Sequence, residues 1–400
     1  MKDVVIVEAC RTAVGKFGGS LKPLDAEALA EAVIRGSLER SGLPAEALDE
    51  VIFGHCRQTS DYSNTARVAA LHAGVPESVP ANTVMCACAS GMLAVGNAAN
   101  SILTGQNRVV LAGGTESMTN AHFYLSNARW GVGTGTTQLK DSLTEAQFCS
   151  QPQDIYGRFN MGMTAENVAV ARNISRADQD AFALRSQEKA AAAIAGGRFR
   201  DEIIPLSVPQ GRKKDPIVFD TDEFPRQTSP EQLAKLKPAF QPDGGTVTAG
   251  NSSGRNDGAS AMLLMSSETA RQYGLKPLAR VLGVSSAGVD PRYMGLGPVP
   301  ATEKLLKRLG MTKEDLDLIE LNEAFAAQSV ACIRELGLEE RQDIINVNGG
   351  AIALGHPIGS SGCRILVTLL HELRRREKNL GLATLCVAGG MGMAAVIETL

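Results

Sequence analysis

The sequence is poor in aromatic residues and lacks the patterns that mark export, membrane insertion or nucleic-acid binding. Aromatic side chains make up 4% of the 400 residues, and the formal net charge is −3, so no basic field favours a nucleic-acid partner. The first residues, M-K-D-V-V-I-V, lack a charged-then-apolar signal pattern, and no apolar run reaches membrane-spanning length. We therefore expect a cytoplasmic globular protein in which local groups hold any anionic ligand.

The eight cysteines lack the spacing of a disulfide framework or of a metal site. They lie at positions 10, 56, 86, 88, 149, 332, 363 and 386. In a reducing compartment they are expected to be free thiols. Cys86-x-Cys88 has no second Cys/His pair at ligand spacing, so no metal site is predicted. There is no Walker sequence and no G-x-G-x-x-G that opens a helix, which disfavours nucleotide hydrolysis and a Rossmann site.

The order of apolar segments indicates an α/β protein. A chain of this length, with 44% hydrophobic and 21% charged residues, is expected to form two or three domains in one compact body. Strands are predicted at 3–9, 50–53 and 108–114, and a helix with apolar residues at helical spacing runs from a cap at Asp25 to Gly42. This alternation predicts a parallel sheet covered on both faces.

The sequence also contains an internal duplication. Three pairs of segments match in the same order: 38–51 with 306–319, Ser90-Gly91 with Ser361-Gly362, and 109–114 with 385–390. We interpret this as two homologous α/β halves packed about a pseudo-twofold axis.

Between the halves the pattern changes. Residues 122–154 predict loops and short elements, and 164–196 predict two helices with a capping box at Ser175. The segment 205–242 either grips a phosphate-rich ligand or is a solvated loop. Its basic residues are Arg212, Lys213, Lys214, Arg226, Lys235 and Lys237. Residues 244–258 are too rich in Gly, Ser and Asn for a helix or central strand, and form either a turn or a place of close backbone approach to a ligand.

The predicted domains follow from these patterns. They are an N-terminal α/β half at 1–118, an inserted loop domain at 119–250, a return to the N-terminal half at 251–276, and a C-terminal α/β half at 277–400.

The stretch 80–96 carries the strongest candidate for chemistry. An apolar run that reads as a strand breaks at Cys86-Ala87-Cys88, and Ser90 opens a helix. The helix N-terminus is expected to favour a thiolate at Cys88, although both cysteines could instead be small core residues. His356 precedes the corresponding helix of the second half, and Cys386 ends the strand that follows. If the halves face each other, Cys88, His356 and Cys386 converge at helix N-termini.

Eight motifs, in order and along nearly the whole chain, give the sequence its resemblance to the thiolases, most closely to the acetyl-CoA acetyltransferases. They are V-E-A-C-R-T-A-V-G-K-F-G-G near the start, C-A-S-G-M at Cys88, A-G-G-T-E-S-M at Ala112, M-G-M-T-A-E-N-V-A at Met161, G-T-V-T-A-G-N-S-S-G at Gly245, N-E-A-F-A at Asn322, N-G-G-A-I-A-L-G-H-P-I-G at Asn348 and C-V-A-G-G-M-G at Cys386. The resemblance implies a thiolase-like fold of two α/β halves with an inserted loop domain.

The resemblance also implies roles for residues at the matching positions. Cys88 would be the nucleophile that takes the acyl group, His356 would remove its proton, and Cys386 would exchange a proton with the α-carbon of acetyl-CoA. Asn322 would hold a water that forms one oxyanion hole with His356. The backbone N–H groups of Cys88 and Ala388 would form the other.

Coenzyme A is implied as substrate and product, with no permanently bound cofactor. Arg226 would lie near the adenine. Ala249, Ser253 and Gly254 would lie along the pantetheine, and Met161, Met294, Ala324 and Phe325 would line the reactive end. Without the resemblance, Met161 and Met294 could equally be plain core residues.

The implied activity is the reversible Claisen condensation of two acetyl-CoA to acetoacetyl-CoA and CoA through an S-acyl-Cys88 intermediate, in fatty acid metabolism. The alternatives are a degradative 3-ketoacyl-CoA thiolase for longer chains, a decarboxylating ketoacyl synthase and a catalytically silent acyl-CoA-binding protein. The family also implies a homotetramer, a dimer of dimers with contacts near 122–140; a plain dimer is the alternative.

Three positions depart from the family pattern. Met85 stands where Asn is common, and Ala388 stands where Gly is usual. Asn160 stands where short-chain members often carry His, which leaves the acyl-chain preference open.

Overall fold

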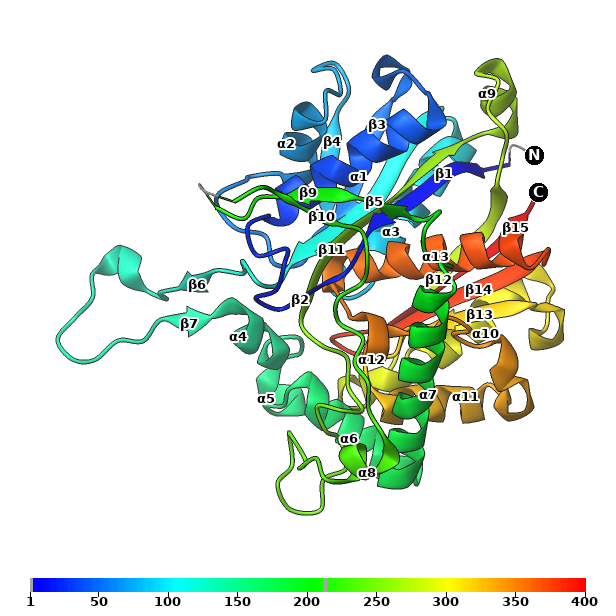
Figure 1. Cartoon of the computed structure of the whole chain (residues 1–400). Helices are drawn as coiled ribbons and strands as arrows, with labels where there is room; N and C mark the ends of the chain where they lie inside the picture. The colour runs from blue at the N-terminus through cyan, green and yellow to red at the C-terminus, as the bar shows by residue number, and fades with distance from the viewer. Residues whose placement is uncertain (1–2, 212–213) are drawn as a thin grey trace.

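The computed structural model describes residues 3–211 and 214–400, and its centre is one continuous sheet (Figure 1). The strands follow the order β13-β14-β15-β12-β1-β11-β5-β3-β4, with β2 paired to β11 and β8 paired to β1. Their bounds are β1 Val5–Thr12, β2 Gly15–Lys16, β3 Glu50–Gly54, β4 Ala81–Val84, β5 Val109–Ser117, β8 Ile203–Ile204, β11 Asn256–Met265, β12 Ala279–Gly288, β13 Leu318–Leu321, β14 Leu380–Val387 and β15 Met391–Thr399. Four short strands form two separate pairs, β6 Phe123–Tyr124 with β7 Lys140–Asp141, and β9 Leu206–Val208 with β10 Ile217–Phe219.

The helices begin and end where capping residues predict. Asp25 accepts a hydrogen bond from the backbone of Ala28 at the start of α1, and Gly42 ends this helix in the left-handed region with φ of 70°. Ser175 and Asp178 form the predicted capping box of α7. The helices are α1 Ala26–Ser41, α2 Thr65–His72, α3 Ser90–Thr104, α4 Ser142–Phe148, α5 Gln153–Tyr156, α6 Met161–Ala171, α7 Arg176–Ala195, α8 Pro230–Ala234, α9 Ser267–Gln272, α10 Pro298–Leu309, α11 Ala326–Glu335, α12 Ala351–Leu354 and α13 Ile358–Arg375.

The predicted duplication is visible in the strand order. In the N-terminal half, β3 pairs with β5 in parallel, and β5, β11 and β1 then follow with antiparallel pairings. In the C-terminal half, β13 pairs with β14 in parallel, and β14, β15 and β12 follow with antiparallel pairings. The two series meet where Val5 and Ile6 of β1 pair with Arg280 and Ala279 of β12.

The prediction of a parallel sheet is wrong, because the sheet is mixed. β15 follows β14 through the short turn 388–390, and a connection this short can join only antiparallel neighbours. β11 returns from the inserted segment and lies antiparallel between β1 and β5. Among the described strands, parallel pairing is limited to β3 with β4 and β5, β13 with β14, and β1 with the short β8.

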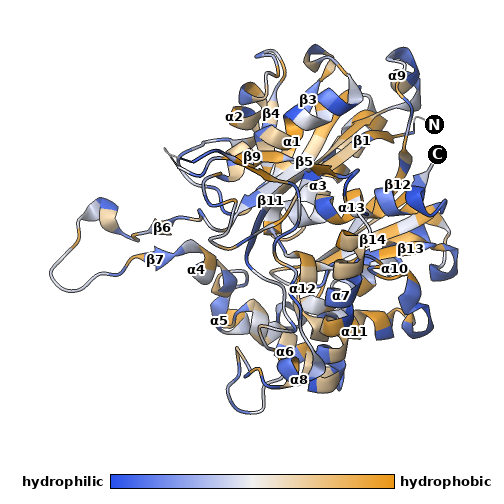
Figure 2. Cartoon of the chain, in the orientation of Figure 1, coloured by the Kyte–Doolittle hydropathy of each residue, from blue (hydrophilic) through white to orange (hydrophobic). Residues whose placement is uncertain are grey.

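The three largest hydrophobic clusters of the described residues form successive layers through the molecule. The first lies between the N-terminal strands and α1 and α2, and the third lies between the C-terminal strands and α10 and α11. The second core, between them, contains α3 and α13 together with strands of both halves. Strands such as β13 and β14 carry mostly apolar residues (Figure 2), which fits burial on both faces.

The two central helices touch at the paired glycines of the duplication. A Cβ atom on Gly91 of α3 would lie 2.9 Å from the backbone nitrogen of Cys363, and one on Gly362 of α13 would lie 2.6 Å from that of Met92. Real Cβ atoms essentially never come so close to backbone. The glycines therefore let the N-terminal ends of both helices meet, and Cys88 and His356 directly precede those ends.

The inserted segment matches its prediction in most respects. Short elements fill 122–154, and the hairpin of β6 and β7 projects from the body (Figure 1). Residues 244–255 contain no helix or strand, but β11 already begins at Asn256, so the predicted irregular stretch is three residues too long. Arg212 and Lys213 lie outside the described residues. In the described part of the chain, no helix is both long enough and apolar enough to cross a membrane.

Candidate active site

A cavity of about 270 Å³ lies at the meeting point of α3, α13 and the turn after β14. It brings together ten of the predicted site residues from distant parts of the chain. They are Cys88, His356, Cys386, Ala388, Ser253, Gly254, Met161, Met294, Ala324 and Phe325. Met294, Ala324 and Cys386 also pack against each other in a small apolar cluster.

Three predicted residues lie outside the cavity wall. Arg226 Nη2 donates a hydrogen bond of 2.6 Å to the carbonyl oxygen of Ala249, so these two contact each other. Asn322 lies in the loop after β13 and is 1% exposed. Neither its Nδ2 nor its Oδ1 has a hydrogen-bond partner among the described residues.

Cys88 sits on a tight turn between β4 and α3. Ala87, directly before it, has a φ of 43°, and Ser90 Oγ closes the turn by donating to the Ala87 carbonyl at 2.7 Å. Burial raises the pKa of Cys88 to about 11, although the backbone N–H of Ala388 and the charge of Arg57 lower it. The predicted thiolate is therefore wrong for the resting site, because desolvation outweighs the helix terminus.

His356 is 5% exposed and neutral. Burial lowers its pKa to about 4, and the Arg364 charge acts in the same direction, while Glu116 opposes both. Its Nδ1 lies 2.6 Å from Ser361 Oγ, which donates its own hydrogen to the Pro357 carbonyl at 2.8 Å. Nδ1 must therefore carry the ring proton. Nε2, which has no hydrogen-bond partner among the described residues, keeps a lone pair and can act as a base.

Cys386 supplies a second protonated thiol. It lies on β14 with 0% exposure, and its pKa is raised well above the ordinary value by burial and by the nearby Cys88 and Cys332. The cavity therefore holds two thiols and one unprotonated imidazole nitrogen. This set can pass a proton from sulfur to His356, and can both accept and donate protons at a bound substrate.

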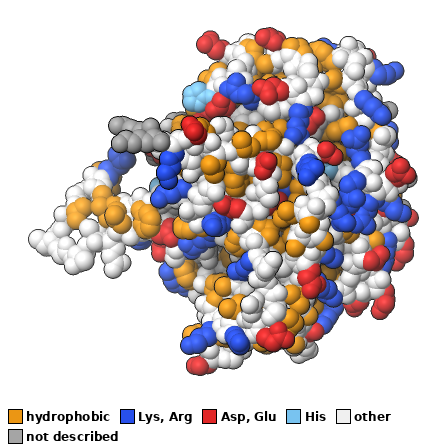
Figure 3. Space-filling view, in the orientation of Figure 1, with side chains coloured by type: hydrophobic (Ala, Val, Ile, Leu, Met, Phe, Trp, Pro, Cys, Tyr) orange, Lys and Arg blue, Asp and Glu red, His pale blue; other side chains and the backbone are white. Residues whose placement is uncertain are grey.

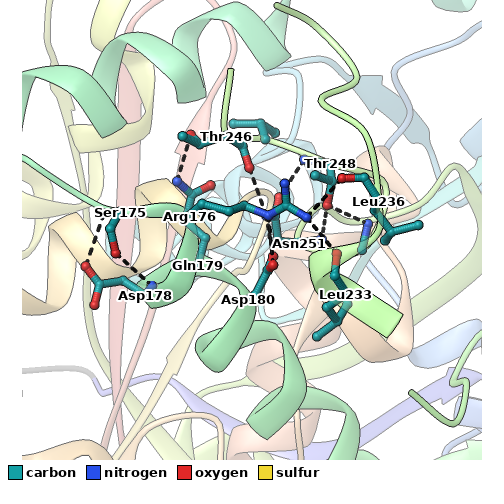
Figure 4. Close-up of polar contacts among 12 residues, drawn as sticks. Ser175, Arg176, Asp178, Gln179, Asp180, Leu233, Leu236, Thr246, Thr248 and Asn251 are labelled. Atoms are coloured by element: carbon teal, nitrogen blue, oxygen red, sulfur yellow. Dashed lines mark hydrogen bonds and ion pairs between the residues drawn. The ribbon is translucent and has the colours of Figure 1, made fainter. Parts of the chain in front are cut away.

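The loop 244–254 is held firmly against α7 (Figure 4). Asn251 Nδ2 donates to Asp180 Oδ1 at 2.9 Å, and Asn251 Oδ1 accepts the backbone N–H of Thr248 at 2.8 Å. Ser253 N–H donates to the Ala324 carbonyl at 3.0 Å. These bonds place the small residues Ser253 and Gly254 on the cavity wall, which favours the second of the two interpretations of this stretch, a close backbone approach to a ligand.

Sequence reasoning missed several lining residues, of which Arg57 and Arg255 carry charge. Arg57 follows the carboxyl end of β3, at the edge of the sheet where sites form in α/β proteins. This position could have identified Arg57 as a candidate site residue. Asn160 was singled out for acyl-chain preference, but its Oδ1 caps α6 by accepting the Met163 N–H at 2.9 Å. It does not line the cavity.

A half-buried cysteine, a buried histidine and a buried second cysteine between two repeated α/β halves define a site for acyl transfer to sulfur. Residues 4–268 match the family described as thiolase, N-terminal domain, and residues 275–399 match thiolase, C-terminal domain. The chain belongs to the thiolase family.

Full-length relatives agree with this assignment. The chain is 54% identical to an acetyl-CoA acetyltransferase of Pseudomonas aeruginosa, with 99% of each chain covered. It is 48% identical to a beta-ketoadipyl-CoA thiolase of the same organism, also with 99% of each covered. The crystal structure of the Bacillus anthracis acetyl-CoA acetyltransferase superposes with a TM-score of 0.96 at 46% identity, covering 100% of this chain and 99% of that one.

Proposed function

We propose that this chain is an acyltransferase that reversibly condenses two acetyl-CoA into acetoacetyl-CoA and CoA through an acyl group on Cys88. The observation that carries the proposal is the convergence of Cys88, His356 and Cys386 on one cavity. Several relatives at about 50% identity are named acetyl-CoA acetyltransferases, which supports the same reaction.

In the first half-reaction His356 Nε2 takes the proton of Cys88, and the thiolate attacks the acetyl-CoA carbonyl carbon. The carbon–sulfur bond to CoA breaks, and the leaving sulfur takes the proton of Cys386. The acetyl group is then on Cys88, and Cys386 is a thiolate. Transfer between two thioesters is nearly energy-neutral, so the site has to supply proton movement rather than a large driving force.

In the second half-reaction the Cys386 thiolate removes a proton from the α-carbon of a second acetyl-CoA. The carbanion attacks the acetyl carbonyl on Cys88, which forms the carbon–carbon bond and releases the Cys88 sulfur. That sulfur recovers its proton from His356. The raised pKa of Cys386 supports this role, because a thiolate with a high pKa is a strong base and a C–H bond is a weak acid.

Two groups of donors suit the oxygens that become negative. The backbone N–H of Ala388 lies close enough to Cys88 to lower its pKa, and with the Cys88 N–H it would form one oxyanion hole. Asn322 brings two buried polar atoms without a hydrogen-bond partner among the described residues, which suits the capture of a water molecule that donates with His356. Loss of one such donor typically costs about 2.7–4 kcal/mol of barrier.

CoA acts as substrate and product, and no permanently bound cofactor is proposed. Ser253 and Gly254 would follow the pantetheine, together with Ala249 outside the cavity wall. Arg226, which donates to Ala249, would lie near the adenine. Met161, Met294, Ala324 and Phe325 would enclose the reacting acyl group. The acidic cluster nearest to a metal-ligand geometry, Glu27, Glu31 and His72, lies on α1 and α2 and has no part in this proposal.

The test is acetoacetyl-CoA thiolysis by Cys88→Ala, with Cys149→Ala as the matched control at an exposed thiol. We expect Cys88→Ala to abolish turnover and the acetyl adduct that mass spectrometry detects on wild-type Cys88. Substantial surviving turnover would refute the nucleophile assignment. A chain-length panel addresses the alternative of a longer-chain degradative thiolase, which predicts higher kcat/KM for medium chains than for acetoacetyl-CoA.

We also propose a homotetramer whose contacts include residues 122–140, and a cytoplasmic location in fatty acid metabolism. The projecting hairpin carries large exposed apolar side chains (Figure 3), among them Trp130 at 88% and Leu139 at 70% exposure. All eight cysteines are free thiols, which supports a reducing compartment. Light scattering of Trp130→Ser against wild type tests the assembly, and an unchanged mass would contradict the contact.

A further inference from the structure

Arg57 is a cation in the active-site cavity whose side chain has no partner in the described part of the chain. It lines the cavity beside Ala87 and Cys88, and its side chain makes no hydrogen bond or ion pair with any described residue. Its Nε is fully buried. A buried guanidinium nitrogen without an acceptor is unfavourable, so this arrangement suits a site that a ligand completes.

The backbone of Arg57 is fixed although its side chain is not. The N–H groups of Cys56 and Arg57 donate to the two oxygens of Glu116 at 3.1 and 3.0 Å. Cys56 Sγ donates to the Ala87 carbonyl at 2.9 Å, in the turn that carries the nucleophile. The backbone from which the guanidinium extends is therefore fixed relative to the turn that carries Cys88.

The acids near Arg57 make no hydrogen bond or ion pair with its side chain among the described residues, although the Arg57 charge helps to lower the pKa of Glu116. The oxygens of Glu116 are occupied by those two N–H groups, by the N–H of Gly359 at 2.9 Å and by His55 Nε2 at 3.4 Å. An adjoining polar hollow that Arg57 also lines contains Asp25, Glu27 and Asp61, and none of these comes within ion-pair distance of it.

The cavity itself offers no counter-charge. Within the described chain no aspartate or glutamate lines it, and its other cation, Arg255, already faces Asp141 with 3.9 Å between Nη1 and Oδ2. His356 is neutral. An anionic group that enters with the acyl chain therefore meets the Arg57 cation and no acidic side chain among the described lining residues.

We propose that Arg57 gives this site a further activity, on 3-ketoacyl-CoA substrates whose acyl chain ends in a carboxylate. A guanidinium pairs with a carboxylate through two parallel hydrogen bonds, which fixes both the charge and the orientation of the acyl chain. This activity rests on the thiolase reaction proposed above and extends its substrate class.

The added step follows the same chemistry in the direction of thiolysis. The Cys88 thiolate attacks the C3 ketone, the C2–C3 bond breaks, and its electron pair takes the proton of Cys386 to give acetyl-CoA. The acyl group with the terminal carboxylate stays on Cys88, facing Arg57. A CoA thiol then attacks this thioester, gives its proton to the Cys386 thiolate, and releases the dicarboxylic acid as its mono-CoA ester.

The test compares two substrates of equal length. 3-Ketoadipyl-CoA ends in a carboxylate, whereas 3-ketohexanoyl-CoA has a methyl group at the same carbon. The ratio of their kcat/KM values is the quantity measured. Arg57 also lowers the pKa of Cys88, so removing it weakens the nucleophile toward every substrate, and the ratio cancels that common effect.

We expect the wild-type ratio to favour 3-ketoadipyl-CoA, and Arg57→Leu to reduce the ratio by about 10- to 100-fold, the loss of one charged hydrogen-bonded contact. Arg57→Lys should retain part of the preference for 3-ketoadipyl-CoA, because lysine keeps the positive charge but cannot form the bidentate pair of hydrogen bonds. Arg108→Leu is the matched control and should leave the ratio unchanged, because Arg108 directly precedes the amino end of β5 and donates to Gln272.

The outcomes separate the two proposals. If wild type cleaves acetoacetyl-CoA but the ratio is near one and unaffected by Arg57→Leu, the carboxylate activity is wrong and the thiolase reaction stands. If Arg57→Leu instead raises the KM for CoA with every substrate and keeps the ratio, Arg57 is a CoA contact and the inference is equally refuted. If wild type cleaves no substrate, the proposed function itself fails.

Discussion

The hydrogen bond from His356 to Ser361 makes the base available, so removing it should slow catalysis. In Ser361→Ala the Nδ1 proton loses its acceptor, which lies 2.6 Å away in a fully buried place. An unsatisfied buried donor costs about 1–3 kcal/mol, and in Ser361→Ala either ring nitrogen would carry one, because Nε2 also has no partner among the described residues. The preference for the tautomer with a free Nε2 is therefore lost, which changes the ratio of the two tautomers by roughly 5- to 150-fold and brings their populations close together.

The assay is kcat/KM for acetoacetyl-CoA thiolysis, together with the rate of acetyl transfer to Cys88. We expect both to fall by about twofold or more in Ser361→Ala, because the tautomer with a free Nε2 is no longer favoured over the other, with Ser361→Thr recovering part of the loss. Ser360→Ala is the matched control, because Ser360 Oγ pairs with Ser260 at 2.8 Å in the same helix turn but does not contact His356. Nitrogen chemical shifts of the ring should report the tautomer change directly.

A Ser361→Ala enzyme that folds and has the same rates as Ser360→Ala would refute this reasoning. The same holds if the ring nitrogen signals show the proton on Nδ1 in both variants. Either result would mean that something other than Ser361 sets the tautomer.

Three further predictions follow from the packing and the pKa shifts. Gly362→Ala should lower the free energy of unfolding by about 1–3 kcal/mol or more, because its Cβ would lie 2.6 Å from backbone; a chemical melt within 0.5 kcal/mol of wild type would contradict this. His356 has a lowered pKa of about 4, so burial of its neutral form adds to the free energy of unfolding above about pH 6.5, and up to about 3 kcal/mol of this is lost as the pH falls from 6.5 to 4. His356→Gln should lack this part of the acid sensitivity. If the free energy of unfolding of His356→Gln has the same pH dependence as that of wild type, the prediction is refuted. With a pKa of about 11, Cys88 should react with iodoacetamide about tenfold faster per pH unit between 7 and 10, whereas a rate that levels off by pH 8 would indicate a resting thiolate.

Much of the architecture could be predicted because it is written in local patterns. Asp25 and Gly42 delimit α1, Ser175 marks the break between α6 and α7, and the repeated segments predicted two similar halves. The strand directions could not be predicted in this way. β11 and β15 owe their antiparallel placement to where the chain returns, which apolar periodicity does not encode.

The candidate site, too, could be predicted only in part. Motifs placed Cys88, His356 and Cys386 in one predicted group, and the cavity contains all three. The predicted thiolate at Cys88 was wrong, because the sequence pattern shows the helix N-terminus that lowers the pKa but does not show the burial in the assembled fold that raises it. Arg57 was missed because a single arginine after a strand has no pattern of its own, and only the cavity reveals that it lacks a partner.

The contact between Gly91 and Gly362 has a consequence for how this enzyme would fail. The nucleophile belongs to one repeat and its base to the other, and the direct strand pairing between the repeats covers little more than Val5 and Ile6. The hydrophobic core around α3 and α13 holds these two helices in place, because it contains strands of both repeats. Heat inactivation and the loss of helical circular dichroism should therefore occur together, in a single transition.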